Sequence, residues 1–108
     1  MNIVNLTYHA IRILAANGTE ITTLPPSGTV IRVTLKRVQV GVVNQIPVYI
    51  SCYGKVDGLP DPQRGTVYVV SALVRLAVPD RRDVMSPGEL VREAKGQPVG
   101  CRGLEANS

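Results

Sequence analysis

The sequence predicts a mostly β protein: a small single-domain barrel or sandwich of six to eight short strands, with at most one short helix. Three observations lead to this fold class. Short stretches rich in Val, Ile and Leu recur along the chain, clusters of Gly, Pro, Asn and Asp separate them, and only one brief stretch has helical spacing. The 108 residues suffice for one modest core and contain no long linker. We therefore expect one β-rich domain over residues 1–108, with residues 105–108 frayed.

The beginning of the chain predicts a strand, a tight turn and a returning strand. Residues 1–14 are rich in β-branched and aliphatic residues, which favour strands. Asn17-Gly18 follows, and this dipeptide is typical of a type I′ hairpin turn because both central positions need positive φ. The segment "EITTL" at 20–24 returns as a strand, and the prolines of "PPSG" at 25–28 end it.

The longest strand is expected within residues 29–43. Its apolar residues occupy odd positions at first and even positions after Arg37. Such a change of parity indicates a bulge or a bend, here near Lys36-Arg37. Asn44-Gln45 is then expected to turn the chain into a further strand at 46–54.

The second half begins with a loop at 55–65, which is rich in Gly and Pro. The first part of 66–78 is apolar on both faces, as a buried central strand would be. Its second part also fits a helix over Ala72–Ala77 capped by Ser71, so helix and strand both remain open there. Beyond it, the sequence predicts a polar loop at 79–89 and a hairpin over 90–104 that turns at Lys95-Gly96.

Charge and composition limit the partners. The net charge is +4, and residues 1–56 carry five basic side chains against one acidic, which favours an anionic partner. The core lacks Phe and Trp, so we expect some stability to come from homo-oligomerisation. No apolar run is long enough to span a membrane and no signal peptide is recognisable, so we expect a cytoplasmic protein whose Cys52 and Cys101 are free thiols.

The sequence favours a binding protein over an enzyme. His9 is the only histidine, no serine lies in a nucleophile-elbow pattern, and neither zinc-ligand spacing nor a phosphate-binding loop motif occurs. We therefore expect no catalysis, no metal and no cofactor. Nucleic-acid binding is also not expected, because exposed aromatics do not alternate with the basic residues. Arg32 and Lys36, on one strand face, could touch a phosphate backbone or simply keep an edge strand soluble.

A candidate ligand site is formed by arginines in or beside loops rich in Gly and Pro, where guanidinium groups and backbone N–H groups bind phosphates. The residues expected to bind phosphate are Arg64, Arg81, Arg82 and Arg102, with Tyr68 or Tyr8 stacking on a base and His9 as an auxiliary donor. In the alternative interpretation, Asp80 and Asp83 neutralise Arg81-Arg82 and the loop is merely solvated.

The segment "NLTYHAI" at 5–11 resembles the opening of a family of small proteins from bacteriophage and prophage genomes, which begin with N-L-T-P-H-x-I. The similarity continues through "LPPSGTVIRV", "GLPDPQRGTVYVVSALV", "RRDVMSPGELVR" and "GQPVGCRGL", and so spans nearly the whole chain. This chain departs from the pattern at Tyr8, where the family has Pro, which removes a rigid turn before His9. The resemblance implies a phage protein in the cytoplasm of an infected bacterium.

Two functions follow as expectations from that setting. The first is a counter-defence sponge, a non-enzymatic protein that sequesters a small anionic, nucleotide-derived immune signal. The alternative is a structural or protein-binding accessory protein, such as a virion component, an assembly factor or an inhibitor of a host protein.

Overall fold

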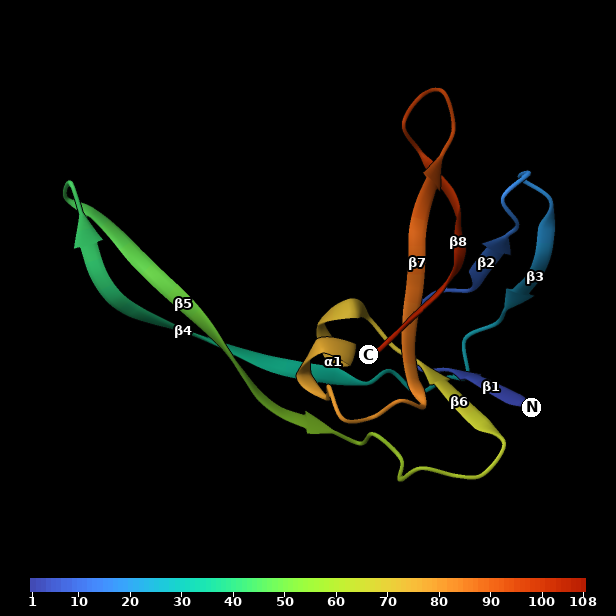
Figure 1. Ribbon diagram of the computed structural model, residues 1–108, viewed down its shortest axis with the longest axis horizontal. Helices are drawn as coiled ribbons and strands as arrows, with labels where there is room; N and C mark the ends of the chain where they lie inside the picture. Colours follow the sequence, from blue (N-terminus) through green and yellow to red (C-terminus); the bar gives the residue numbers. More distant parts are fainter.

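The computed structural model describes residues 1–108 as eight strands and one short helix (Figure 1). In chain order they are β1 (Asn2–Asn5), β2 (Ile11–Leu14), β3 (Glu20–Leu24), β4 (Arg32–Val43), β5 (Ile46–Asp57), β6 (Thr66–Val69), α1 (Ala72–Ala77), β7 (Val84–Arg92) and β8 (Pro98–Ala106). The mostly β class with one short helix is therefore confirmed.

Six strands form one curled sheet in the order β1-β6-β7-β8-β2-β3. The β2–β3 and β7–β8 pairs are antiparallel and the other neighbours are parallel. Val69 of β6 packs against Ile11 and Ile13 of β2, although β7 and β8 lie between these strands in the sheet. The side-chain amide of Asn5, at the end of β1, also donates to the carbonyl of Leu24, at the end of β3. The sheet is thus rolled toward a barrel, with Val69 on its concave side.

The side chains around Val69 inside the roll form one core. A second core lies on the outer face of the sheet, under helix α1. It contains Leu6, Ile31, Tyr68, Val70, Val74 and Val84. Because side chains alternate along a strand, Tyr68 faces this outer core while Val69 faces the inside of the roll. The prediction that this stretch is apolar on both faces because it is a buried central strand is confirmed.

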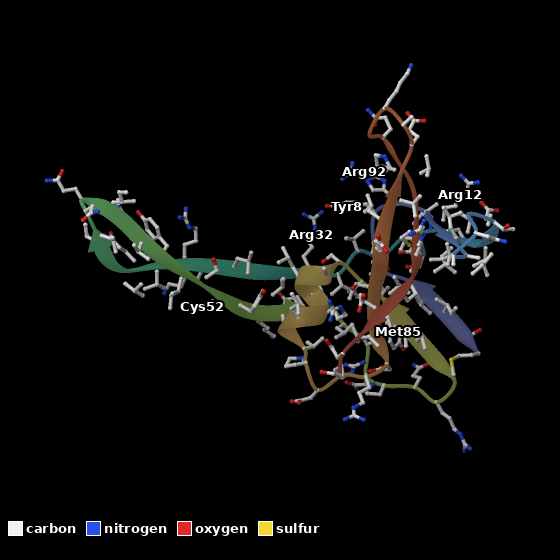
Figure 2. All side chains as sticks on the ribbon, turned by 45° about the horizontal axis from the view of Figure 1, so that its top comes forward. Tyr8, Arg12, Arg32, Cys52, Met85 and Arg92 are labelled. Carbon is white, nitrogen blue, oxygen red and sulfur yellow. The ribbon has the colours of Figure 1, made fainter.

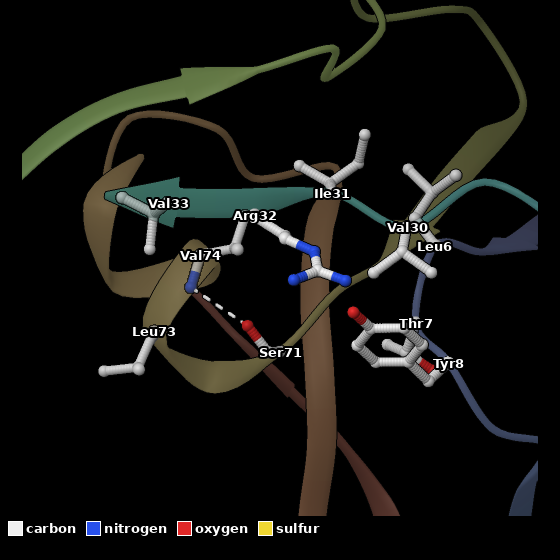
Figure 3. A pocket seen from close by; sticks show the side chains of 10 residues that line it. All are labelled: Leu6, Thr7, Tyr8, Val30, Ile31, Arg32, Val33, Ser71, Leu73 and Val74. Atoms are coloured by element: carbon white, nitrogen blue, oxygen red, sulfur yellow. Dashed lines mark hydrogen bonds between the residues drawn. The ribbon is translucent and has the colours of Figure 1, made fainter. Parts of the chain in front are cut away.

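Residues 72–77 are a helix, which settles the alternative left open by the sequence. Ser71 is its N-cap, and its hydroxyl accepts a hydrogen bond from the Val74 N–H at 3.3 Å (Figure 3). Val74 is the helix residue buried in the outer core, while Leu73 and Leu76 remain about half exposed. This six-residue helix thus covers the sheet with a single fully buried side chain.

Strands β4 and β5 form a separate two-stranded ribbon that projects from the body, called the arm here (Figure 1). Its register shifts lie between Val33 and Leu35 and between Gln39 and Gly41, on either side of the predicted bend. The arm turns at Asn44 and Gln45, which have φ of 48° and 68°. Positive φ at both central residues is the mark of a type I′ turn.

The β2–β3 hairpin turns differently from the expectation. Gly18 has a φ of 87°, but Asn17 does not have positive φ. The Gly18 N–H bonds to the Ala15 carbonyl, and the Ala15 N–H bonds to the Thr19 carbonyl. This is the three-residue hairpin loop with glycine in the left-handed position, so the hairpin is confirmed and its type I′ geometry is wrong.

Two further expectations are corrected in the last third of the chain. The polar loop predicted at 79–89 ends early, because β7 begins at Val84, which is completely buried. Residues 105–106 belong to β8, and the Asn107 amide donates to the carbonyls of Arg75, Val78 and Arg81 at 3.2, 2.9 and 3.1 Å. Frayed ends lack such bonds, so the predicted fraying is wrong as far as residue 107.

Candidate functional site

The segment between β1 and β2 is held by one buried side chain, Asn5. The Asn5 amide donates to the carbonyls of His9 at 2.8 Å and Leu24 at 3.0 Å. Its oxygen accepts from the N–H and the hydroxyl of Thr7, at 2.9 and 2.7 Å. Asn5 is only 2% exposed, so these four bonds satisfy a polar group that would otherwise be costly to bury. They fix a loop that presents Tyr8 and His9 outward.

Tyr8 lies at the rim of a cavity of about 260 Å³ between this loop, the start of β4 and helix α1 (Figure 3). Seven of its ten lining residues are hydrophobic, and Leu6, Ile31 and Val74 among them belong to the outer core. Its polar lining residues are Thr7, Arg32 and Ser71. An apolar cavity with a few polar groups is the ordinary composition of a small-molecule site.

Arg32 supplies the positive charge at this rim. Its guanidinium carbon lies 4.8 Å from the centroid of the Tyr8 ring, and Figure 2 shows both residues where the arm joins the body. Asp57 is its partner across the arm, but the Asp57 carboxylate lies 3.8 Å from the Lys55 ammonium instead. None of the four ion pairs of the chain includes Arg32. An arginine stacked on a ring keeps its N–H edge available to an anion.

His9 lines a different cavity, of about 380 Å³, on the other side of the loop. Arg12, Pro87, Leu90, Pro98 and Cys101 are also among its lining residues. The charge of Arg12 is already compensated, because its Nε donates to Glu20 Oε1 at 2.6 Å. His9 therefore lies in the cavity without the uncompensated cation that marks the Tyr8 site.

The guanidinium of Arg81 is already hydrogen-bonded to other groups of the chain. Its Nε and Nη2 donate to the two carboxylate oxygens of Asp83 at 2.8 and 2.9 Å, and Nη2 also donates to the Pro60 carbonyl at 2.8 Å. The hydrogen bond between the two side chains raises the pKa of Arg81 and lowers the pKa of Asp83, against the opposing effect of burial. Arg81 is thus neutralised as the alternative interpretation described, and it joins two loops instead of facing a phosphate.

The other residues of the sequence-predicted site do not form one cradle. Arg64 and Arg82 precede β6 and β7, which are parallel neighbours, so both lie exposed at the same end of the sheet. Arg102 pairs with Glu89 across the β7–β8 ladder, five residues beyond Val84, or about 17 Å along the strand. Its guanidinium is 3.9 Å from the Glu89 carboxylate.

Tyr68 is not placed to stack on a base. It is only 3% exposed, and its hydroxyl donates to the Asp61 carbonyl at 3.5 Å. The structure therefore brings Tyr8 and His9 to cavities, while it places Tyr68 in the core. Arg32 was not among the site residues chosen from the sequence, and no local motif joins residue 32 to residue 8.

The chain contains neither a grouped set of metal ligands nor a disulfide. No cluster of three His, Cys, Asp or Glu side chains occurs. Cys52 is exposed on the arm and Cys101 is buried, and both are free. The single helix is six residues long, too short to cross a membrane.

No family model, no curated protein and no solved structure matches the chain. The relation to phage and prophage proteins therefore stays a prediction from the sequence segments quoted above.

Proposed function

We propose that this protein binds and retains a small anionic, nucleotide-derived ligand at the cavity lined by Tyr8 and Arg32. The observation that carries the proposal is the unpaired guanidinium of Arg32, stacked 4.8 Å from the Tyr8 ring at the mouth of an apolar cavity. Such a pair offers a planar surface to a base and hydrogen-bond donors to a phosphate.

The size of the cavity indicates which part of the ligand it holds. About 260 Å³ is slightly smaller than the pockets that enclose drug-sized molecules. It suits a base or another flat ring, whose faces would lie against Leu6, Ile31 and Val74. The phosphates would remain at the rim, within reach of Arg32.

Retention without turnover is the activity we propose. The lining of the cavity beside Tyr8 contains no carboxylate, histidine or thiol. His9, the one histidine, lines the other cavity, and its ring centroid lies 6.2 Å from that of Tyr8. A protein of this kind acts by lowering the free concentration of a signal, for which affinity alone suffices. In the phage setting that the sequence segments imply, this is sequestration of an immune signal in the infected host's cytoplasm.

Ligand retention tests the proposal directly. The protein is incubated with lysate from phage-infected cells, washed and denatured by heat, and the released molecules are identified by mass spectrometry. We expect an intact nucleotide from the wild type and from Arg82→Gln, which removes an exposed arginine outside the cavity, and none from Arg32→Gln. A chemically modified nucleotide would indicate an enzyme. Release of nothing, or equal release from both variants, would reject this site.

A second candidate function is protein binding, as a virion, assembly or inhibitory accessory protein. It is favoured by the exposed apolar side chains of the arm, among them Val43, Ile46 and Ile50. This function predicts one specific protein partner that is lost when the arm is altered, with no nucleotide released in the same experiment.

A further inference from the structure

The arm lacks the packing that a two-stranded ribbon needs. Its strands have 12 residues each, and they lie outside the six-stranded sheet. An isolated two-stranded hairpin is marginally stable in water. The whole chain has a radius of gyration of 16.5 Å, against about 13 Å for a compact domain of this length. The arm extends into solvent in Figure 1 without a second layer against its outer half.

The two faces of the arm differ in character. Paired residues of antiparallel strands share a face, and faces alternate along each strand. Val38 pairs with Ile50, Val43 pairs with Ile46, and Val48 lies between them on the same side. These five residues, called the aliphatic face here, are each between 37% and 63% exposed. The opposite face carries Arg37, Gln39, Tyr49 and Ser51 and, beside the turn, the apolar pair Val42–Pro47. Arg37 stacks 4.2 Å from the Tyr49 ring centroid, so this face mixes charged, polar and apolar groups.

The lack of charged residues around the aliphatic face indicates what kind of surface can bind there. Residues 38–50 contain no Lys, Arg, Asp or Glu, although Lys36 and Arg37 immediately precede them. A charged partner would therefore find no counter-charge on this part of the arm. A surface of uncharged β-branched side chains fits it best, and this molecule carries one itself.

We propose that the aliphatic face packs on the same face of a second copy of this chain, about a two-fold axis near Val48. The two ribbons would then form a four-stranded sandwich with a shared apolar layer. With the arms antiparallel, Lys36 of each copy lies beside the uncharged Asn44-Gln45 turn of the other, so no like charges meet. Such a self-complementary contact closes at two copies and does not propagate. The inference does not depend on the proposed ligand.

The mass of the protein in solution tests whether this contact between two copies forms. By light scattering after gel filtration, we expect the wild type to have twice the 11.6 kDa mass of the chain. Ile50→Lys places a charge on the aliphatic face and should halve the mass, whereas Ser51→Lys places it on the opposite face and should leave the dimer intact. A monomeric wild type, or a dimeric Ile50→Lys variant, would overturn the proposal.

A crosslink provides the second measurement, in case Ile50→Lys disturbs the fold of the arm. In a Cys52→Ser background, Val48→Cys should form a disulfide between two copies under mild oxidation, because Val48 lies near the axis. Gln39→Cys, on the opposite face, should not. Equal crosslinking of both variants, or of neither, would overturn the proposal. So would a monomer that instead retains a different protein through its arm.

Discussion

The guanidinium of Arg32 stacks on the ring of Tyr8, 4.8 Å from its centroid, although 23 residues separate them in the sequence. Two links bring them together. Asn5 fixes the loop that presents Tyr8, and the Ile31 N–H bonds to the Leu6 carbonyl at 3.1 Å, which joins the start of the arm to the same loop. The position of the pair therefore depends both on this loop and on the start of the arm.

The aromatic ring of Tyr8 should contribute to retention. Tyr8→Ala removes the ring and should lower the nucleotide retained per mole of protein about tenfold, as expected for the loss of about 1.4 kcal/mol of stacking. Tyr8→Phe keeps the ring and should retain the wild-type amount. If both variants retain equally, a base does not stack on this residue.

Asn5 should be among the most sensitive polar positions in the chain. Asn5→Ala leaves the bonded groups of Thr7, His9 and Leu24 without their partner, which we expect to lower the free energy of unfolding by about 3 kcal/mol. Asn17→Ala removes only one exposed bond to the Thr19 N–H, so its effect should be below about 1 kcal/mol. Urea unfolding followed by circular dichroism measures both. Equal losses would show that the Asn5 bonds do not hold the loop.

The sequence predicted the elements that local chemistry determines. For residues 72–77 the sequence left helix and strand open, but it named Ser71 as the cap of the helix that forms, because the cap and the apolar spacing act within one turn. The hairpin at Lys95-Gly96 was foreseen because its turn is encoded in adjacent residues. The start of β7 was missed because Ser86, a polar residue, is buried there and its hydroxyl accepts from Arg75 Nε at 2.8 Å. That partner comes from a separate element.

The candidate site was less accessible to sequence reasoning than the fold. Tyr8 and His9 were selected from the sequence, and both line cavities. Arg32 was not selected for the site, because its position beside Tyr8 depends on how the arm docks on the loop. Tyr68 was chosen as an aromatic near loops, but strand alternation turns it into the outer core.

The Arg81–Asp83 pair should contribute to stability only above acidic pH. The Arg81 hydrogen bond lowers the pKa of Asp83 in the folded state below its ordinary value. The unfolded chain therefore takes up the proton first, so this contribution is present above about pH 4 and is lost as the pH falls further. Asp83→Asn should make the fall of the urea midpoint between pH 6 and pH 3 shallower. An unchanged acid dependence would show that the pair does not stabilise the fold.

Asn107 should stabilise the C-terminal end of helix α1. Its amide donates to three carbonyls, and its oxygen accepts from Arg75 Nη1 at 3.2 Å. Asn107→Ala should therefore lower the free energy of unfolding by about 2 kcal/mol, whereas Ser108→Ala, at an exposed terminal residue, should have no measurable effect. Hydrogen exchange at Val78 and Arg81 gives a local reading, since the N–H groups of both residues bond within this turn. Unchanged exchange and stability would restore the expectation of a frayed end.

Replacing Gln45 in the turn of the arm by glycine should stabilise the protein. Gln45 has a φ of 68°, which costs a non-glycine residue about 1–2 kcal/mol. Gln45→Gly removes that cost and adds about 0.5–1 kcal/mol of backbone entropy loss on folding, so a net gain remains. It also creates the Asn-Gly pair that type I′ turns prefer. The thermal midpoint should rise by a few degrees, while Gly18→Ala, at a φ of 87°, should lower it. If Gln45→Gly leaves the midpoint unchanged while Gly18→Ala lowers it, the arm unfolds independently of the body.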